Sequence, residues 1–154
     1  TERIKFMILA HTIVGLMPID NYQFSWYWLA GSIIPDVDHL FVIYKHKLFS
    51  WDKLIDAEKF EDKYNIHFKT KYGHSVFGAI IMTFPILLIS TKGALYFFIG
   101  YLIHLILDWL DRDEKQYLYP LKIKFRGFLP IFSMPERIFT AFLILFVFYL
   151  YIIL

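Results

Sequence analysis

The chain contains no cysteine among its 154 residues, which excludes both a disulfide framework and a cysteine-ligated zinc site. Charged side chains are also sparse: they make up 19% of the chain, against about 25% in an ordinary soluble domain. The net charge is only +2, and no basic stripe stands apart from apolar sequence, so we expect no nucleic-acid partner. Hydrophobic residues reach 58% and aromatic residues 21%, a composition that excludes intrinsic disorder and is typical of a membrane protein.

Five stretches are apolar on nearly every side when they are drawn as helices, as expected of helices that are buried or face lipid. None of them reaches the roughly 20 residues that cross a full bilayer. We therefore expect one all-α domain over residues 1–154, a compact membrane-embedded bundle of about five helices, either in a thinned bilayer or only partly immersed. The predicted helices cover residues 4–17, 22–34, 75–90, 94–110 and 138–154.

Two polar insertions, residues 44–73 and 111–136, separate the apolar stretches. If each helix crosses the membrane once, the amino terminus and both insertions lie on one side, together with every Lys and Arg except Lys92. The positive-inside rule then predicts that the amino terminus and both insertions lie in the cytoplasm. The alternative is a monotopic bundle with only one or two true spans.

Ionisable residues within the apolar stretches are informative, because each costs about 2.5 to 3.5 kcal/mol at the middle of a membrane helix and usually marks function. His104 and Asp108 are four residues apart, so they share one face of the predicted helix 94–110. Such a pair can chelate one divalent ion or form the edge of a two-metal site. The alternative is a hydrogen-bonded pair that only orients helices.

A second signature, Pro35-Asp36-Val37-Asp38-His39, follows the second apolar stretch. Proline suits the first turn of a helix, and Asp36 and His39 share a face of that helix. Asp38 points elsewhere, where it can serve a second metal or an outer shell. Acidic residues also cap helix amino termini, but capping explains one aspartate rather than two with a histidine.

His11 and His74 carry a weaker signal. His11 lies in the middle of the first predicted helix, where the alternative is a buried, hydrogen-bonded histidine, and His74 lies where the third begins, where the alternative is a cap or surface residue. Each helical histidine has a glycine one turn away, which lets helices approach closely around inward-pointing ligands. These glycines are Gly15, Gly78 and Gly100.

The crossing model places most of these residues at the cytoplasmic end of the bundle. A cluster of His and Asp without Cys suits zinc or a two-metal hydrolytic centre, with manganese or iron as alternatives. The residues placed at that end are Asp36, His39, His74 and Asp108.

Together these motifs resemble the YdjM-like family of LexA-binding, inner-membrane-associated metal-dependent hydrolases, a remote relative of zinc-dependent phospholipase C and the zinc single-strand nucleases. The resemblance covers nearly the whole chain in the right order. Its features are an early helical His11, the Pro35–His39 signature, His74-Ser75, the run from Gly100-Tyr101-Leu102 through His104 to Asp108, Tyr119-Pro120, Lys124-Phe125-Arg126 and Leu129-Pro130-Ile131.

One position departs from the family pattern. The family usually has a second histidine five residues before the His-Ser pair, where this chain has Lys69, and the nearest histidine is His67. Either His67 substitutes through a longer loop, or Lys69 and Lys71 hold substrate instead.

The resemblance implies a phospholipase C-like phosphoesterase that uses metal-activated water on a phospholipid or another phosphodiester at the cytoplasmic face. It implies a divalent metal, zinc in the first place and two or more ions, with catalytic roles for Asp38, His74 and Asp108, Asp38 being the candidate general base or bridging group. The metal ligands it implies are His11, Asp36, Asp38, His39, His74, His104 and Asp108. The residues expected to hold phosphate or a lipid head group are Lys69, Lys122, Lys124 and Arg126.

Two other functions stay open at this point. The family name records binding of a protein regulator, so the chain can be a non-catalytic membrane module with a structural metal. Intramembrane His and Asp also build metal or proton pathways. Transporters usually place their sites at the midplane between repeated halves, whereas this chain has no internal repeat.

Overall fold

The computed structural model describes residues 5–19, 22–59, 70–112, 114–129 and 133–153. Within these ranges the chain is mostly α-helical, has no β-strand and forms two isolated β-bridges. The prediction of an all-α fold is confirmed. The elements are α1 (Lys5–Gly15), the 3-10 turn η1 (Tyr22–Phe24), α2 (Ser25–Ile33), the 3-10 turn η2 (Ile34–Asp36), α3 (Val37–Lys45), α4 (Trp51–Lys59), α6 (Val76–Leu87), α7 (Thr91–Trp109) and α8 (Met134–Ile153).

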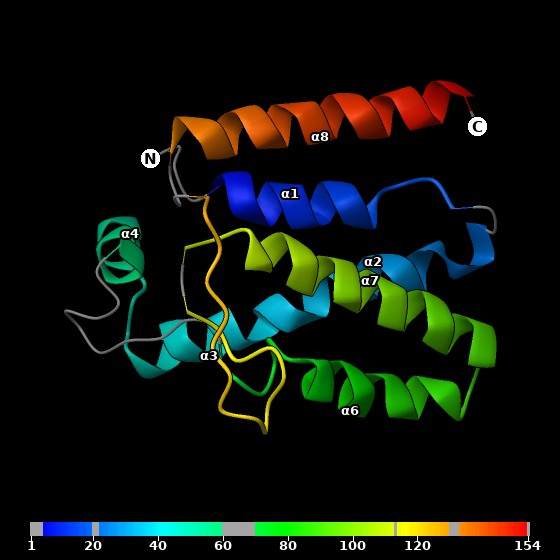
Figure 1. Cartoon of the computed structure of the whole chain (residues 1–154), viewed down its shortest axis with the longest axis horizontal. Helices are drawn as coiled ribbons and strands as arrows, with labels where there is room; N and C mark the ends of the chain where they lie inside the picture. The colour runs from blue at the N-terminus through cyan, green and yellow to red at the C-terminus, as the bar shows by residue number, and fades with distance from the viewer. Residues whose placement is uncertain (1–4, 20–21, 60–69, 113, 130–132, 154) are drawn as a thin grey trace.

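Helix α7 is the centre of the bundle. It packs against α2, α6 and α1, and α1 in turn packs against α8. Figure 1 shows α8, α1, α7 and α6 one below another with their axes running in roughly the same direction. Helices α3 and α4 and the loop of residues 111–129 gather at one end, so the described parts of both polar insertions lie at the same end of the bundle.

The second apolar stretch is divided differently from the prediction. Helix α2 passes through η2 directly into α3 instead of ending at residue 34. Pro35 permits this because it stands at the start of η2, where a backbone N–H has no intrahelical partner to lose. The first polar insertion contributes a helix of its own, α4, whose Leu54 and Ala57 pack against Val42 of α3.

Helices α7 and α8 begin earlier than predicted. The Ser90 hydroxyl caps α7 by accepting the N–H of Gly93 at 3.0 Å, and α8 starts at Met134 and reaches 20 residues. The expectation that no helix attains spanning length is therefore wrong for α8. With a mean hydropathy of 2.0, α8 is the one helix within the described ranges that is long and apolar enough to cross a membrane. A bundle that crosses five times stays a prediction.

Two glycines let the backbones of α2 and α7 touch. A Cβ atom on Gly31 would lie 2.1 Å from the carbonyl oxygen of Phe97, and one on Gly100 would lie 2.5 Å from that of Trp28. Neither contact can be relieved by a side-chain rotation, because both involve backbone atoms. The close helix approach expected at Gly100 is confirmed. Its consequence is that the buried Ser32, on α2, meets the middle of α7.

We expect Gly31→Val to destabilise the protein by about 1–3 kcal/mol, the usual cost of overpacking, because α2 must move away from α7. Thermal unfolding in detergent measures the effect. The matched control is Ala141→Val on the exposed side of α8, which should leave the unfolding temperature nearly unchanged. Equal unfolding temperatures for the two variants would show that the α2–α7 contact is looser than described.

Candidate metal centre

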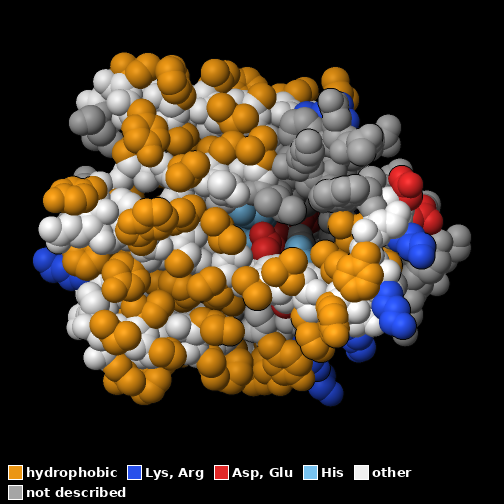
Figure 2. All heavy atoms as spheres, turned by 180° about the vertical axis from the view of Figure 1, so that it is seen from behind, with side chains coloured by type: hydrophobic (Ala, Val, Ile, Leu, Met, Phe, Trp, Pro, Cys, Tyr) orange, Lys and Arg blue, Asp and Glu red, His pale blue; other side chains and the backbone are white. Residues whose placement is uncertain are grey.

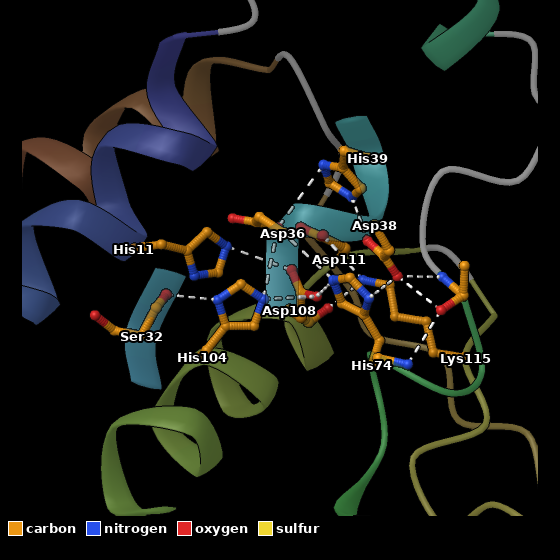
Figure 3. Close-up of polar contacts among 12 residues, drawn as sticks. His11, Ser32, Asp36, Asp38, His39, His74, His104, Asp108, Asp111 and Lys115 are labelled. Carbon is orange, nitrogen blue, oxygen red and sulfur yellow. Dashed lines mark hydrogen bonds and ion pairs between the residues drawn. The ribbon is translucent and has the colours of Figure 1, made fainter. Parts of the chain in front are cut away.

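The structure brings all seven predicted metal-ligating residues into one cluster (Figure 3). They come from four separate segments: α1, the junction of η2 with α3, the turn before α6, and the second half of α7. Three overlapping groups have ligand atoms within 4.8 Å of one another. These groups are His11 with Asp36 and His104, Asp36 with His39 and His74, and His74 with His104 and Asp108.

Helix geometry and helix caps determine where these side chains point. Asp36 and His39 lie three residues apart at the start of α3, and His104 and Asp108 lie one helical turn apart on α7, so both pairs share a face as predicted. His74 precedes Ser75, which caps α6 by accepting the N–H of Gly78 at 3.1 Å. The turn that carries His74 is tied down from α7, because the buried Tyr101 hydroxyl donates to the carbonyl oxygen of Gly73.

The inward ring nitrogens are spaced from the carboxylates like ligands of a common ion. His104 Nε2 lies 3.6 Å from Asp36 Oδ1 and 3.6 Å from Asp108 Oδ2. His74 Nε2 lies 3.7 Å and 3.3 Å from the same two carboxylates. These distances exceed the roughly 3.2 Å limit of a good N–H···O bond. Two ligand atoms about 2.0 Å from one tetrahedral ion are roughly 3.3 Å apart, so the spacing fits coordination better than hydrogen bonding.

The outward ring nitrogens are hydrogen-bonded instead. His104 Nδ1 donates to the backbone carbonyl of Ser32 at 2.8 Å, and because a carbonyl only accepts, this bond puts the ring proton on Nδ1. His74 Nδ1 donates to Asp38 Oδ2 at 3.1 Å. Neither Nε2 atom, both buried, has a hydrogen-bond partner among the described residues. In His104 this leaves the tautomer that metal-binding histidines adopt, with one nitrogen anchored and a lone pair turned inward. In His74 a metal would take the inward position that a proton occupies in the metal-free protein.

Asp38 is placed to orient His74. Its Oδ2 accepts the N–H and the hydroxyl of Thr70 at 2.9 and 2.8 Å in addition to the His74 bond. Burial raises the pKa of Asp38, but the bonds from His74 and Thr70 outweigh burial and lower this pKa below its usual value. The occupied Oδ2 is a poor proton acceptor, while Oδ1 faces His39 Nε2 at 3.9 Å, and Asp38 belongs to none of the three candidate ligand groups. The geometry therefore favours the outer-shell alternative for Asp38 over the general-base one.

His11 and His39 complete the two flanks. The His11 ring stacks on His104 with centroids 4.0 Å apart, and its Nε2 lies 3.4 Å from Asp108 Oδ1. The opposite flank is formed by His39, whose Nδ1 lies 3.8 Å from Asp36 Oδ1. The His39 side chain is 20% exposed and that of Asp36 17%, whereas the side chains of His104 and Asp108 are fully buried. The cluster is therefore reached from the α3 side.

The cluster concentrates negative charge that needs a cation. Burial alone lowers the pKa of His74, but the carboxylates of Asp36, Asp38 and Asp108 around the ring raise this pKa to about 9. Burial alone raises the pKa of Asp36, yet the neighbouring histidines, His74 first, hold it well below its usual value. Carboxylates this acidic stay ionised at neutral pH. Without a metal, a proton on His74 supplies the compensating charge.

Among the described residues, the predicted phosphate-binding side chains are not gathered into one set. Lys124 donates to Glu114 at 2.8 Å on the surface, and Arg126 Nε donates to the carbonyl oxygen of Arg112 at 3.0 Å. Lys122 is exposed, and both Lys69 and His67 lie outside the described residues. Their roles stay predictions.

Sequence reasoning missed the supports of the cluster. The Ser32 carbonyl is a backbone group, and Thr70 carries no motif. The buried ion pair of Asp111 and Lys115 comes shortly after Asp108 in the chain. Its four-residue spacing was the only feature of the sequence that could have indicated it.

The fold and the site define an all-α protein with a buried His/Asp cluster whose spacing suits metal ligands. The chain belongs to the YdjM inner membrane protein family, whose model matches residues 7–154. Comparison with curated proteins found no match, and comparison with solved structures found none either. The family and the apolar α8 together support association with a membrane.

We expect the stability of the metal-free protein to depend on pH through His74. Because the folded-state pKa of about 9 exceeds the ordinary 6.5, the stabilisation is complete below pH 6.5 and is lost as pH rises through 9. The unfolding temperature, measured in detergent with a chelator, should fall over that window, and added metal should abolish the fall.

The control for this measurement is the exposed His46: His46→Gln should keep the pH dependence that His74→Gln removes. A metal-free unfolding temperature that stays flat between pH 6.5 and 9 would contradict the charge balance described.

Proposed function

We propose that this protein is a membrane-associated, metal-dependent phosphoesterase. The observation that carries the proposal is that the two nitrogens of each of two histidine rings make different contacts. In His74 and His104 the outward nitrogen is hydrogen-bonded, while the inward nitrogen faces carboxylates at 3.3–3.7 Å without a bond. Hydrogen-bonded helix pairs would use both nitrogens.

Zinc is the ion we propose, and the donor set suits two neighbouring ions. Three to four His and Asp ligands without Cys are typical of catalytic zinc, and the absence of soft ligands leaves manganese and iron as alternatives. Asp36 belongs to two of the candidate groups, which lie on opposite flanks with His11 and His39. A carboxylate shared in this way is suited to bridge two ions.

Bound divalent ions supply a nucleophilic water near neutral pH and neutralise charge on phosphoryl oxygens. The chain's own residues set the conditions for that chemistry. Asp38 holds the His74 ring, the Ser32 carbonyl holds His104, and the fully buried Asp108 faces three histidines from inside the protein. Asp36 and His39, on the exposed flank, are the residues that a substrate phosphate reaches first.

The surroundings of the opening favour a phospholipid as substrate. Figure 2 shows Asp/Glu and His side chains within a hollow that has hydrophobic side chains along part of its edge. The residues next to the exposed ligands along the chain are apolar: Val37 follows Asp36 and is 53% exposed, and Leu40 follows His39 and is 65% exposed. Exposed apolar side chains beside a polar floor match a lipid whose head group enters while its chains stay outside. We place the opening on the cytoplasmic side, as the distribution of Lys and Arg predicts.

The test is metal content and hydrolysis measured on the same detergent-purified protein. We expect at least one zinc per chain, and cleavage of a generic phosphodiester such as bis(p-nitrophenyl) phosphate that is faster for a phospholipid in mixed micelles. Asp108→Asn should lower activity by about 100-fold or more, because it removes a charge that faces three histidines. His46→Gln, an exposed histidine change, should leave activity unaltered.

Each alternative function has its own signature in this test. Tightly bound metal without hydrolysis of either substrate would favour a non-catalytic module with a structural metal. Metal flux into proteoliposomes would favour transport. Wild-type protein that holds no metal would eliminate the proposal.

A further inference from the structure

A buried ion pair, Asp111 with Lys115, adjoins the His/Asp cluster at Asp108. The Lys115 side chain is 5% exposed and the Asp111 side chain 3%, and Lys115 Nζ donates to Asp111 Oδ2 at 3.0 Å. The same ammonium also donates to the backbone carbonyl of Asp108, the cluster's buried carboxylate residue. The ion pair therefore reaches the metal centre through a single residue.

The carbonyl that Lys115 binds lies in the last turn of α7, where it also accepts the backbone N–H of Asp111 at 3.2 Å. A cation at this end is also favoured by the helix dipole. The loop of residues 111–129 crosses the same helix end at very short range: a Cβ on Gly127 would lie 2.1 Å from the carbonyl oxygen of Trp109. Leu110, next in the chain, has its carbonyl bound by the N–H groups of Phe128 and Leu129.

We propose that Asp111 and Lys115 are positioning residues that hold Asp108 for metal binding, an inference that rests on the proposed metal centre. Stability alone does not account for such a pair, since replacing a buried ion pair by apolar side chains of similar size is often neutral or stabilising. A metal site, in contrast, needs its ligands held within about 0.5 Å of the productive geometry. The pair fixes the backbone of Asp108 by a charge-assisted bond that an apolar pair cannot make.

The test replaces both partners at once, because removing one would leave an uncompensated buried charge. We expect Asp111→Leu with Lys115→Met to weaken zinc binding by about 10- to 100-fold, the usual effect of removing an outer-shell partner of a metal ligand. Zinc affinity is measured in detergent by competition with a chromophoric chelator. Hydrogen exchange of the metal-free protein over residues 105–111 should rise in the double variant.

The same loop offers a matched control, the exposed ion pair of Glu114 and Lys124 with its 2.8 Å contact. Glu114→Leu with Lys124→Met removes an ion pair of the same loop without touching α7, and it should leave the zinc affinity and the exchange of residues 105–111 unchanged. The unfolding temperature of the metal-free Asp111→Leu, Lys115→Met protein should stay within a few degrees of wild type.

The inference is overturned if the double variant binds zinc as tightly as wild type, or if affinity falls only in proportion to a loss of metal-free stability. If the double variant does not fold, Asp111→Asn, which keeps an acceptor for Lys115, must still weaken binding at least threefold. The proposed function fails separately: zinc that binds tightly without phosphodiester hydrolysis removes the enzyme and leaves this inference standing.

Discussion

The contact between α2 and α7 is the constraint on which the rest of the structure depends. At this crossing a side chain on either Gly31 or Gly100 would collide with backbone of the opposite helix. Because the helices touch, the carbonyl of Ser32 reaches Nδ1 of His104 and fixes the proton there. The other nitrogen of that ring is then a bare lone pair facing Asp36 and Asp108. A packing feature made of two glycines thus decides which nitrogen of the His104 ring points toward the carboxylates.

The need to compensate the negative charge of its aspartates makes the cluster a site for a cation. Ionised aspartates in a buried place are costly unless a cation joins them. In the metal-free protein a proton on His74 fills this role, at the price of a pKa near 9, and a divalent ion would fill it better. The distances separate the two kinds of contact: the outward nitrogens of His74 and His104 lie 2.8–3.1 Å from their acceptors, whereas the inward nitrogens lie at 3.3–3.7 Å.

The position of the cluster within the fold agrees with the proposed action at a membrane. The fully buried members of the cluster, His104 and Asp108, lie on α7, and the accessible ones, Asp36 and His39, lie at the start of α3, beside exposed apolar side chains. Helix α8, the candidate span, packs on α1, which carries His11. A lipid head group that enters from the α3 side would therefore meet ligands whose supports lie deeper in the protein. The family of inner membrane proteins to which the chain belongs is consistent with this arrangement.

Local sequence was enough for the helical fold and for most of the cluster, because composition and spacings of three or four residues report on single helices. The pairs Asp36 with His39 and His104 with Asp108 were predictable for that reason, and so was the close approach at Gly100. Helix starts were missed where a cap, such as Ser90, lies outside the apolar run. The supports of the cluster were decided by tertiary structure alone. The Ser32 carbonyl meets a ring 72 residues away and Thr70 meets Asp38 across 32 residues. Contacts between a backbone group and a distant side chain leave no periodic trace in a sequence.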